Sequence, residues 1–190
     1  MKYLVVCALS HLISLNVFSQ DNIEQTFEEY RLLIEEKNYD EAFSYYHQDL
    51  LKYIPKTQLR QQFTALEENE SLEHSLKNSK IVFLSEPLTK DSIEYRFIRY
   101  KTDLHLKLNP DLSDQQIQKY IRYFKENYGS DCSFVPSQNL IIINKKQELI
   151  GIKENEWKFV IYKPKLNSFM HLWVPEDIMT TFFILAINNK

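Results

Sequence analysis

The chain has 190 residues, a formal net charge of −3 and a hydrophobic fraction of 44%. Apolar content of this order in a chain of domain size argues for one folded domain and against disorder. The slight excess of acid disfavours nucleic-acid binding, because phosphate backbones require a basic surface. Two glycines, Gly129 and Gly151, are too few for the loops that bind nucleotide phosphates.

The first twenty residues have the pattern of a targeting segment. Lys2 supplies a positive charge, and a mostly apolar run follows it. This pattern predicts a signal peptide over residues 1–19, cleaved after Ser19, and a single mature domain over 20–190. We therefore expect an exported protein, periplasmic or secreted, without a transmembrane anchor after cleavage. An N-terminal core helix and a lipid on Cys7 are the alternatives.

The stretch after the signal peptide predicts three helices. The first covers about 22–37. Asp40 is expected to cap the second, because its carboxylate accepts hydrogen bonds from the unpaired N–H groups of a first turn. Pro55 ends the second helix, and Thr57 caps the third. Apolar residues recur at helical spacing along all three: Ile23, Phe27, Tyr30 and Ile34, then Ala42, Phe43, Tyr46 and Leu50, then Leu59, Phe63 and Leu66.

The next segments alternate with the period of strands. Residues 80–84 predict a strand, 86–91 a turn, and 92–108 one long strand. The apolar parity of the long strand changes near Phe97 and Ile98. A change of parity inside a strand predicts a bulge, which would bend the strand and curve the sheet.

A further helix is expected over about 113–128. Ser113 and Gln116 have the spacing of a capping box, and Gly129 ends the pattern. One face of this helix is aromatic, which is typical of packing but also suits a platform for a ligand. The aromatic residues are Tyr120, Tyr123, Phe124 and Tyr128.

Short strands are expected to follow over 140–144, 148–153 and 157–162, with turns at 145–147 and 154–156. After them, Pro175 and two acidic residues predict the start of a last helix. This helix contains the apolar run 178–187, which is too short to span a membrane. A terminal core helix or a partner-binding segment fits the run better.

Helices followed by a bent antiparallel sheet indicate an α+β fold, with N-terminal helices packed on a strongly curved sheet. Two stretches carry a family resemblance: Tyr30 to Leu66, with the break at 37–40, and Leu149 to Val160, where a polar turn precedes Trp-Lys. They resemble the nuclear transport factor 2-like superfamily of cone-shaped domains, which also includes ketosteroid isomerase and scytalone dehydratase. The helix at 113–128 and the C-terminal extension depart from that pattern, and a cystatin-like arrangement is the alternative.

The resemblance implies acid–base chemistry inside the cone if the protein is an enzyme. The candidate bases are His47, Asp103 and His105, since a general base must reach its proton and titrate near the working pH. Asp103 and His105 share one face of a strand, but their parity includes Lys101 and Lys107 and is expected to face solvent. His47 lies one position off the apolar face of its helix. No catalytic residue is therefore assigned.

Aromatic residues are the candidates for ligand binding: Tyr46, Tyr95, Tyr100 and Trp157. No metal site or cofactor is expected, because paired cysteines and helical His-Glu spacings are absent. Cys132 is the one mature cysteine and is interpreted as a packing thiol rather than a nucleophile. The preferred hypothesis is an exported, non-catalytic module that binds a small ligand or a protein partner. A lyase or isomerase with a buried histidine or carboxylate, and a homodimer formed through 178–187, are the alternatives.

Overall fold

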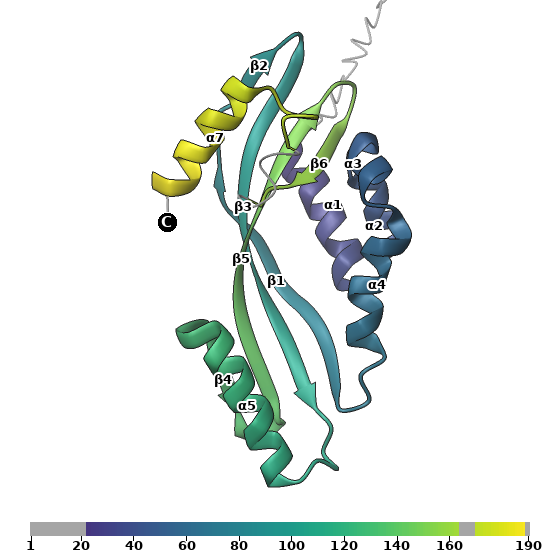
Figure 1. Ribbon diagram of the computed structural model, residues 1–190, viewed down its shortest axis with the longest axis vertical. Coiled ribbons are helices and arrows are strands. Elements are labelled where there is room, and N and C mark those ends of the chain that lie inside the picture. The colour runs from purple at the N-terminus through teal and green to yellow at the C-terminus, as the bar shows by residue number, and fades with distance from the viewer. Residues whose placement is uncertain (1–21, 164–169, 189–190) are drawn as a thin grey trace, which may run out of the picture.

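The computed structural model describes residues 22–163 and 170–188, so the predicted signal peptide lies outside the described residues. These residues form an α+β protein in which helices pack on a six-stranded antiparallel sheet that is not closed (Figure 1). The predicted fold class is confirmed. In this part of the chain, no helix is both long and apolar enough to cross a membrane.

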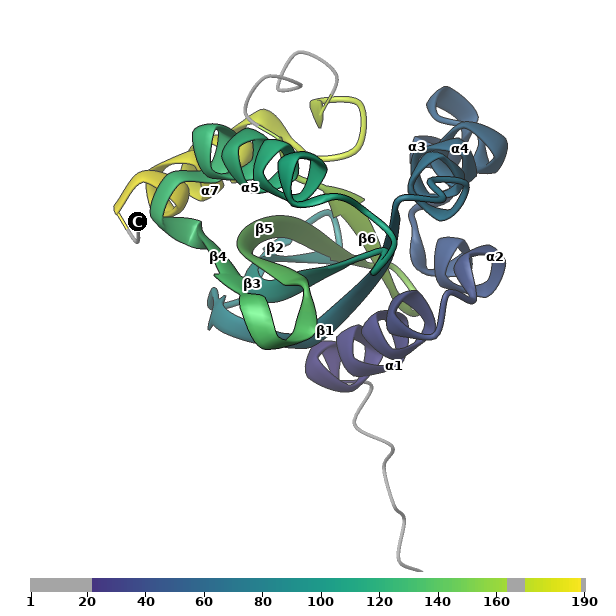
Figure 2. The ribbon, with the colours of Figure 1, turned by 90° about the horizontal axis from the view of Figure 1, so that it is seen from below.

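The N-terminal helices lie together on one side of the sheet (Figure 2). The predicted second helix is broken, because Tyr46 adopts an extended backbone and pairs with Phe159, and the His47 N–H donates to the Phe159 carbonyl at 3.0 Å. Two predicted helix caps are wrong. Asp40 lies inside a short helix, and Pro55 rather than Thr57 caps the helix that begins at Lys56. The helices are α1 (Ile23–Glu35), α2 (Tyr39–Ala42), α3 (Gln48–Tyr53) and α4 (Lys56–Glu67), with a 3₁₀ turn at Phe43–Tyr45.

The sheet has the order β1-β3-β5-β4, with β2 on β3 and β6 on β5. The predicted turn at 86–91 contains a short strand, and the chain reverses at Asp91 and Ser92, whose φ angles are 50° and 64°. Positive φ at both central residues is what a tight hairpin requires. The strands are β1 (Leu72–Leu84), β2 (Leu88–Lys90), β3 (Ile93–Leu108), β4 (Cys132–Val135), β5 (Leu140–Lys153) and β6 (Trp157–Ile161).

Strand β5 is continuous where the sequence predicted a turn. It pairs with β3 without interruption from Leu140 opposite Lys107 to Lys153 opposite Glu94. The predicted turn at 145–147 is therefore wrong. Lys-Lys-Gln is typical of a turn, but the long strand β3 pairs with all three of these residues, and this tertiary pairing overrides the local preference.

The change of parity in β3 is confirmed, but the bulge predicted there is wrong. Tyr95, Phe97 and Arg99 are buried on one face, and Ile98 and Tyr100 are buried on the other. Both faces are covered at this point, because Phe27 of α1 contacts Tyr100 and Phe182 of the C-terminal helix contacts Phe97. No distortion of β3 is needed, and the register shifts lie in the neighbouring β1.

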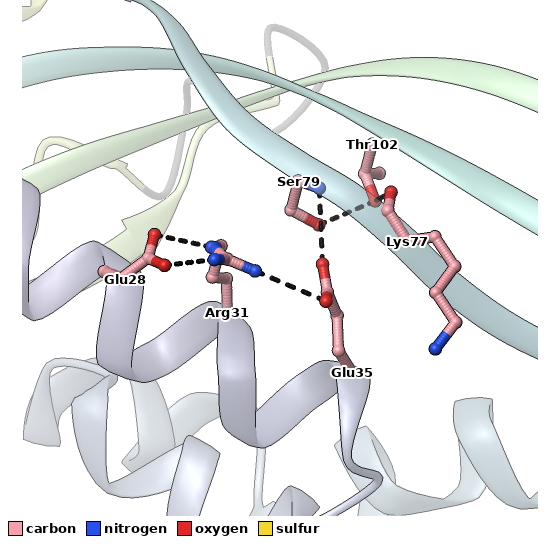
Figure 3. Close-up of polar contacts among 6 residues, drawn as sticks. All are labelled: Glu28, Arg31, Glu35, Lys77, Ser79 and Thr102. Carbon is pink, nitrogen blue, oxygen red and sulfur yellow. Dashed lines mark hydrogen bonds and ion pairs between the residues drawn. The ribbon is translucent and has the colours of Figure 1, made fainter.

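The first register shift in β1 is held by polar contacts with α1 and β3 (Figure 3). Asn78 has a φ of 55°, and the Ser79 N–H donates to Glu35 at 3.2 Å. The Ser79 and Thr102 hydroxyls are 2.8 Å apart. On α1, Arg31 lies between Glu28 and Glu35. A bulge pinned in this way blunts the edge strand, since Glu35 occupies an N–H that would otherwise be free to pair.

The long strands divide into two halves with different surroundings. We call Ile93–Tyr100 of β3 and residues 147–153 of β5 the upper half, as oriented in Figure 1. Its faces are covered by α1–α4 and by helix α7 (Glu176–Asn188), which follows Pro175 as predicted. Arg99 ties α7 to the sheet: its guanidinium donates to Glu148 at 2.6 Å and to the Ala186 carbonyl at 2.9 Å.

The lower half consists of residues 102–108 of β3 and 140–145 of β5. Helix α5 (Asp114–Tyr128) packs on it with a second, smaller apolar cluster. The predicted capping box of Ser113 and Gln116 is present, and the helix ends at Gly129 as predicted. The helix predicted over about 113–128 is therefore confirmed, and it lies at the end of the sheet away from α7 (Figure 1).

Candidate functional site

His47 lies apart from the other two candidate bases, Asp103 and His105, which are both on β3. His47 precedes α3, where its Nδ1 accepts a hydrogen bond from the Asp49 N–H at 3.3 Å. Its Nε2 is 4.0 Å from Glu154, and both residues line a hollow of about 420 Å³ beside the β5–β6 turn. This histidine serves as a helix cap, a structural role that its position off the apolar face did not indicate.

Asp103 and His105 share a face of β3, but their surroundings differ. Asp103 accepts a hydrogen bond from Asn78 Nδ2 at 2.8 Å, so it helps to hold the bulge in β1. His105 instead lines a hollow of about 740 Å³ near the lower end of the sheet, together with Glu73 and Lys107. Among the described residues, no group of three or more histidines, cysteines or acids is placed to hold a metal ion.

The four aromatic candidates are buried in the upper half. Tyr46 and Tyr30 share a hydrogen bond of 2.9 Å between their hydroxyls, and Tyr100 donates to Gln147 at 3.0 Å. Burial raises the pKa of Tyr46, Tyr95 and Tyr100, so these hydroxyls stay protonated. Trp157 packs over Gly151. None of the four lines a hollow described here, and their role as ligand contacts stays a prediction.

Cys132 is buried in the core of the lower half, and the C-terminal apolar run 178–187 is partly buried in the core of the upper half. Burial raises the pKa of the Cys132 thiol, whereas a nucleophilic cysteine needs a lowered pKa. In α7, Ile178 and Phe182 are buried, and Phe183 and Ile184 are exposed by 43% and 52%. The surface available for a homodimer is smaller than the run of residues 178–187 suggested, and the homodimer stays a prediction.

A largely apolar hollow lies between α5 and the lower half of the sheet. Its volume is about 760 Å³, within the range of sites that hold small molecules. We call it the α5 groove. Its lining comes from the α4–β1 turn, the sheet, the β3–α5 connection and α5: Asn69, Ser71, Leu72, Leu104, Leu106, Leu112, Gln116, Lys119, Tyr120, Tyr123, Phe124, Tyr128 and Lys145.

The apolar face of α5 is only partly buried. Ile121 is buried, but Tyr120 and Phe124 are half-buried, and Tyr123 and Tyr128 are 58% and 37% exposed. An amphipathic helix normally buries its apolar stripe against the core. Here the stripe lies over the groove, so the apolar surface that would stabilise the helix on the sheet remains accessible. The aromatic platform considered from the sequence is therefore at a cavity.

Lys145 is the charged residue of the groove that comes from the sheet. It is half-buried opposite Thr102, and its ammonium lies over the Tyr128 ring, 5.6 Å from the centroid. Loss of surrounding water lowers its pKa, and the positive charge of Lys163 lowers it further. The sequence interpretation missed this residue because it placed Lys145 in a turn. Continuous strand parity from Ile141 and Ile143 is the signal that would have found it.

Comparison of the chain with protein-family models, with curated proteins and with solved structures finds no match. The resemblance to the nuclear transport factor 2-like superfamily therefore stays a prediction. The functional argument rests on the groove and its residues.

Proposed function

We propose that this is an exported, non-catalytic binding module that holds a small, largely apolar ligand in the α5 groove. The observation that carries the proposal is the open apolar face of α5 above a hollow of about 760 Å³. Burying such a face favours association by roughly 25 cal/mol for each Å² of apolar surface removed from water. A ligand that fills the groove would complete the packing of α5 on the sheet.

The groove favours binding over catalysis. Its described lining residues include two lysines and three tyrosines but neither a carboxylate nor an imidazole. A lyase or isomerase of the kind that the family resemblance implies needs such a base within reach of the substrate. His47 and His105 line other hollows, so the enzyme alternative has no support from this site.

The test uses Nile red, an uncharged apolar dye whose fluorescence increases when it leaves water. We expect the purified protein to bind the dye, and we expect Ser71→Trp to abolish binding by filling the groove. Ser75→Trp is the matched control, because Ser75 is only four residues further along the chain, on β1, but lines the hollow around His105. Circular dichroism of both variants checks that the fold is kept.

Equal dye binding by the wild-type protein and Ser71→Trp would place the dye elsewhere and overturn the proposal. Loss of binding in Ser75→Trp with retention in Ser71→Trp would transfer the function to the hollow around His105.

A further inference from the structure

The inward-facing positions of β5 contain polar residues that interrupt the apolar pattern. Ile141, Ile143 and Leu149 are buried, and Lys145 and Gln147 occupy the same parity between them. Gln147 accepts a hydrogen bond from Tyr100 at 3.0 Å, so Lys145 is the one that places a charge there. A lysine at such a position loses part of its hydration, so a sequence selected only for stability would place an apolar residue there. Violations of this kind are expected at functional sites.

The charge of the groove is of one sign. Lys145 and Lys119 line it, and none of its described lining residues is acidic. The structure gives Lys145 the Tyr128 ring as a neighbour and no carboxylate partner within the described residues. A half-buried ammonium without a counter-ion favours an anion that reaches it, because charge-assisted hydrogen bonds strengthen where water is excluded.

We propose that the ligand of the α5 groove is an amphipathic organic anion, an alkyl chain that ends in a carboxylate held by Lys145. This inference rests on the proposed function, since it names the chemistry of the ligand for the same groove. The alkyl chain would lie between Leu104, Leu106 and the aromatic face of α5. Lys119, at the exposed surface of the helix, adds a second positive charge to the lining.

The test compares decanoate with 1-decanol as competitors of Nile red. We expect decanoate to displace the dye at about tenfold lower concentration than decanol, since hydrogen bonds to charged groups are the stronger ones. Lys145→Met should remove this difference and leave displacement by decanol unchanged. Lys146→Met is the matched control, because it deletes the same charge from the next residue, which is exposed on the other face of β5.

Each outcome separates the two proposals. Equal displacement by decanoate and decanol in the wild-type protein overturns the anion and leaves the binding module standing. The same loss in Lys145→Met and Lys146→Met also overturns it, because a general charge effect would then explain the preference. If Nile red does not bind, the proposed function fails for an uncharged ligand. Calorimetry with decanoate then decides: Lys145-dependent heat supports the anion, and its absence overturns it.

Discussion

The upper and lower halves of the sheet are built from the same strands but are packed differently. In the upper half, α1–α4 cover one face and α7 the other, and Phe97, Ile98 and Ile150 are completely buried. In the lower half, α5 covers the sheet with a hollow left between them. Close packing on two sides is what a stable core requires. The lower half lacks part of that packing, which is why we propose ligand binding there.

The largest expected effect is a loss of stability when a buried phenylalanine of the upper half is replaced, compared with the same replacement in the lower half. Phe97 is fully buried among Phe83, Tyr162 and Phe182, so Phe97→Ala should lower the free energy of unfolding by about 4 kcal/mol. Phe124→Ala should cost about 1 kcal/mol, because its side chain already faces the groove. Urea denaturation measures both. Equal losses would mean that the two halves are packed alike.

The same contrast explains which elements the sequence could predict. Helix α5 was located correctly because its capping box and terminal glycine are local signals. The second N-terminal helix was not, because Phe159, more than a hundred residues away, pairs with Tyr46 and breaks it. Long-range pairing of this kind leaves no mark on local composition.

The candidate site shows the same limit. The aromatic face of α5 was visible from its spacing, but the sequence did not reveal that a cavity lies beneath it. Lys145 was not recognised as an inward-facing residue, because Lys-Lys-Gln has the composition of a turn although it pairs with β3 as part of a strand. His47, Asp103 and His105 were chosen for their chemistry, and the fold separates them into a helix cap, a bulge contact and a surface hollow.

A smaller effect compares the two glycines. A Cβ on Gly151, in the upper half, would lie 2.5 Å from Ile23 Cδ1 and 3.2 Å from the Trp157 ring. Gly151→Ala should therefore cost about 2 kcal/mol through overpacking. Ile23→Val removes the Cδ1 atom, so the double variant should be less destabilised than the sum of the single variants. Thermal unfolding of the wild-type protein and of the three variants completes the cycle.

Gly129, at the end of α5, is the control for that cycle. Apart from its adjoining residues in the chain, no described residue has an atom within 4 Å of its ideal Cβ position, and its φ is 54°. Gly129→Ala should cost about 1 kcal/mol through backbone strain alone, and Ile23→Val should not change that cost. If Ile23→Val leaves the Gly151→Ala cost unchanged, contact with Ile23 is not what makes the upper half intolerant of added volume.

The smallest expected effect is a gain of stability in the lower half. Lys145→Met removes a charge that has lost part of its water, so we expect the free energy of unfolding to rise by about 1 kcal/mol at neutral pH. Lys146→Met should change it by less than about 0.5 kcal/mol, since Lys146 is exposed. Urea denaturation without ligand measures both.

The gain in stability from Lys145→Met should depend on pH, because folding lowers the pKa of Lys145. In the folded protein, the pKa of Lys145 lies below the ordinary 10.5, because of lost hydration and the charge of Lys163, with the Tyr128 ring as the facing neighbour. The folded state therefore holds this proton less tightly than the unfolded state does. The cost is full below the lowered pKa and disappears as pH rises towards 10.5, so the advantage of Lys145→Met should shrink over the same range. An advantage that is constant with pH, or a loss of stability at neutral pH, would mean that Lys145 supports the fold, and its place in the groove would then need no ligand to explain it.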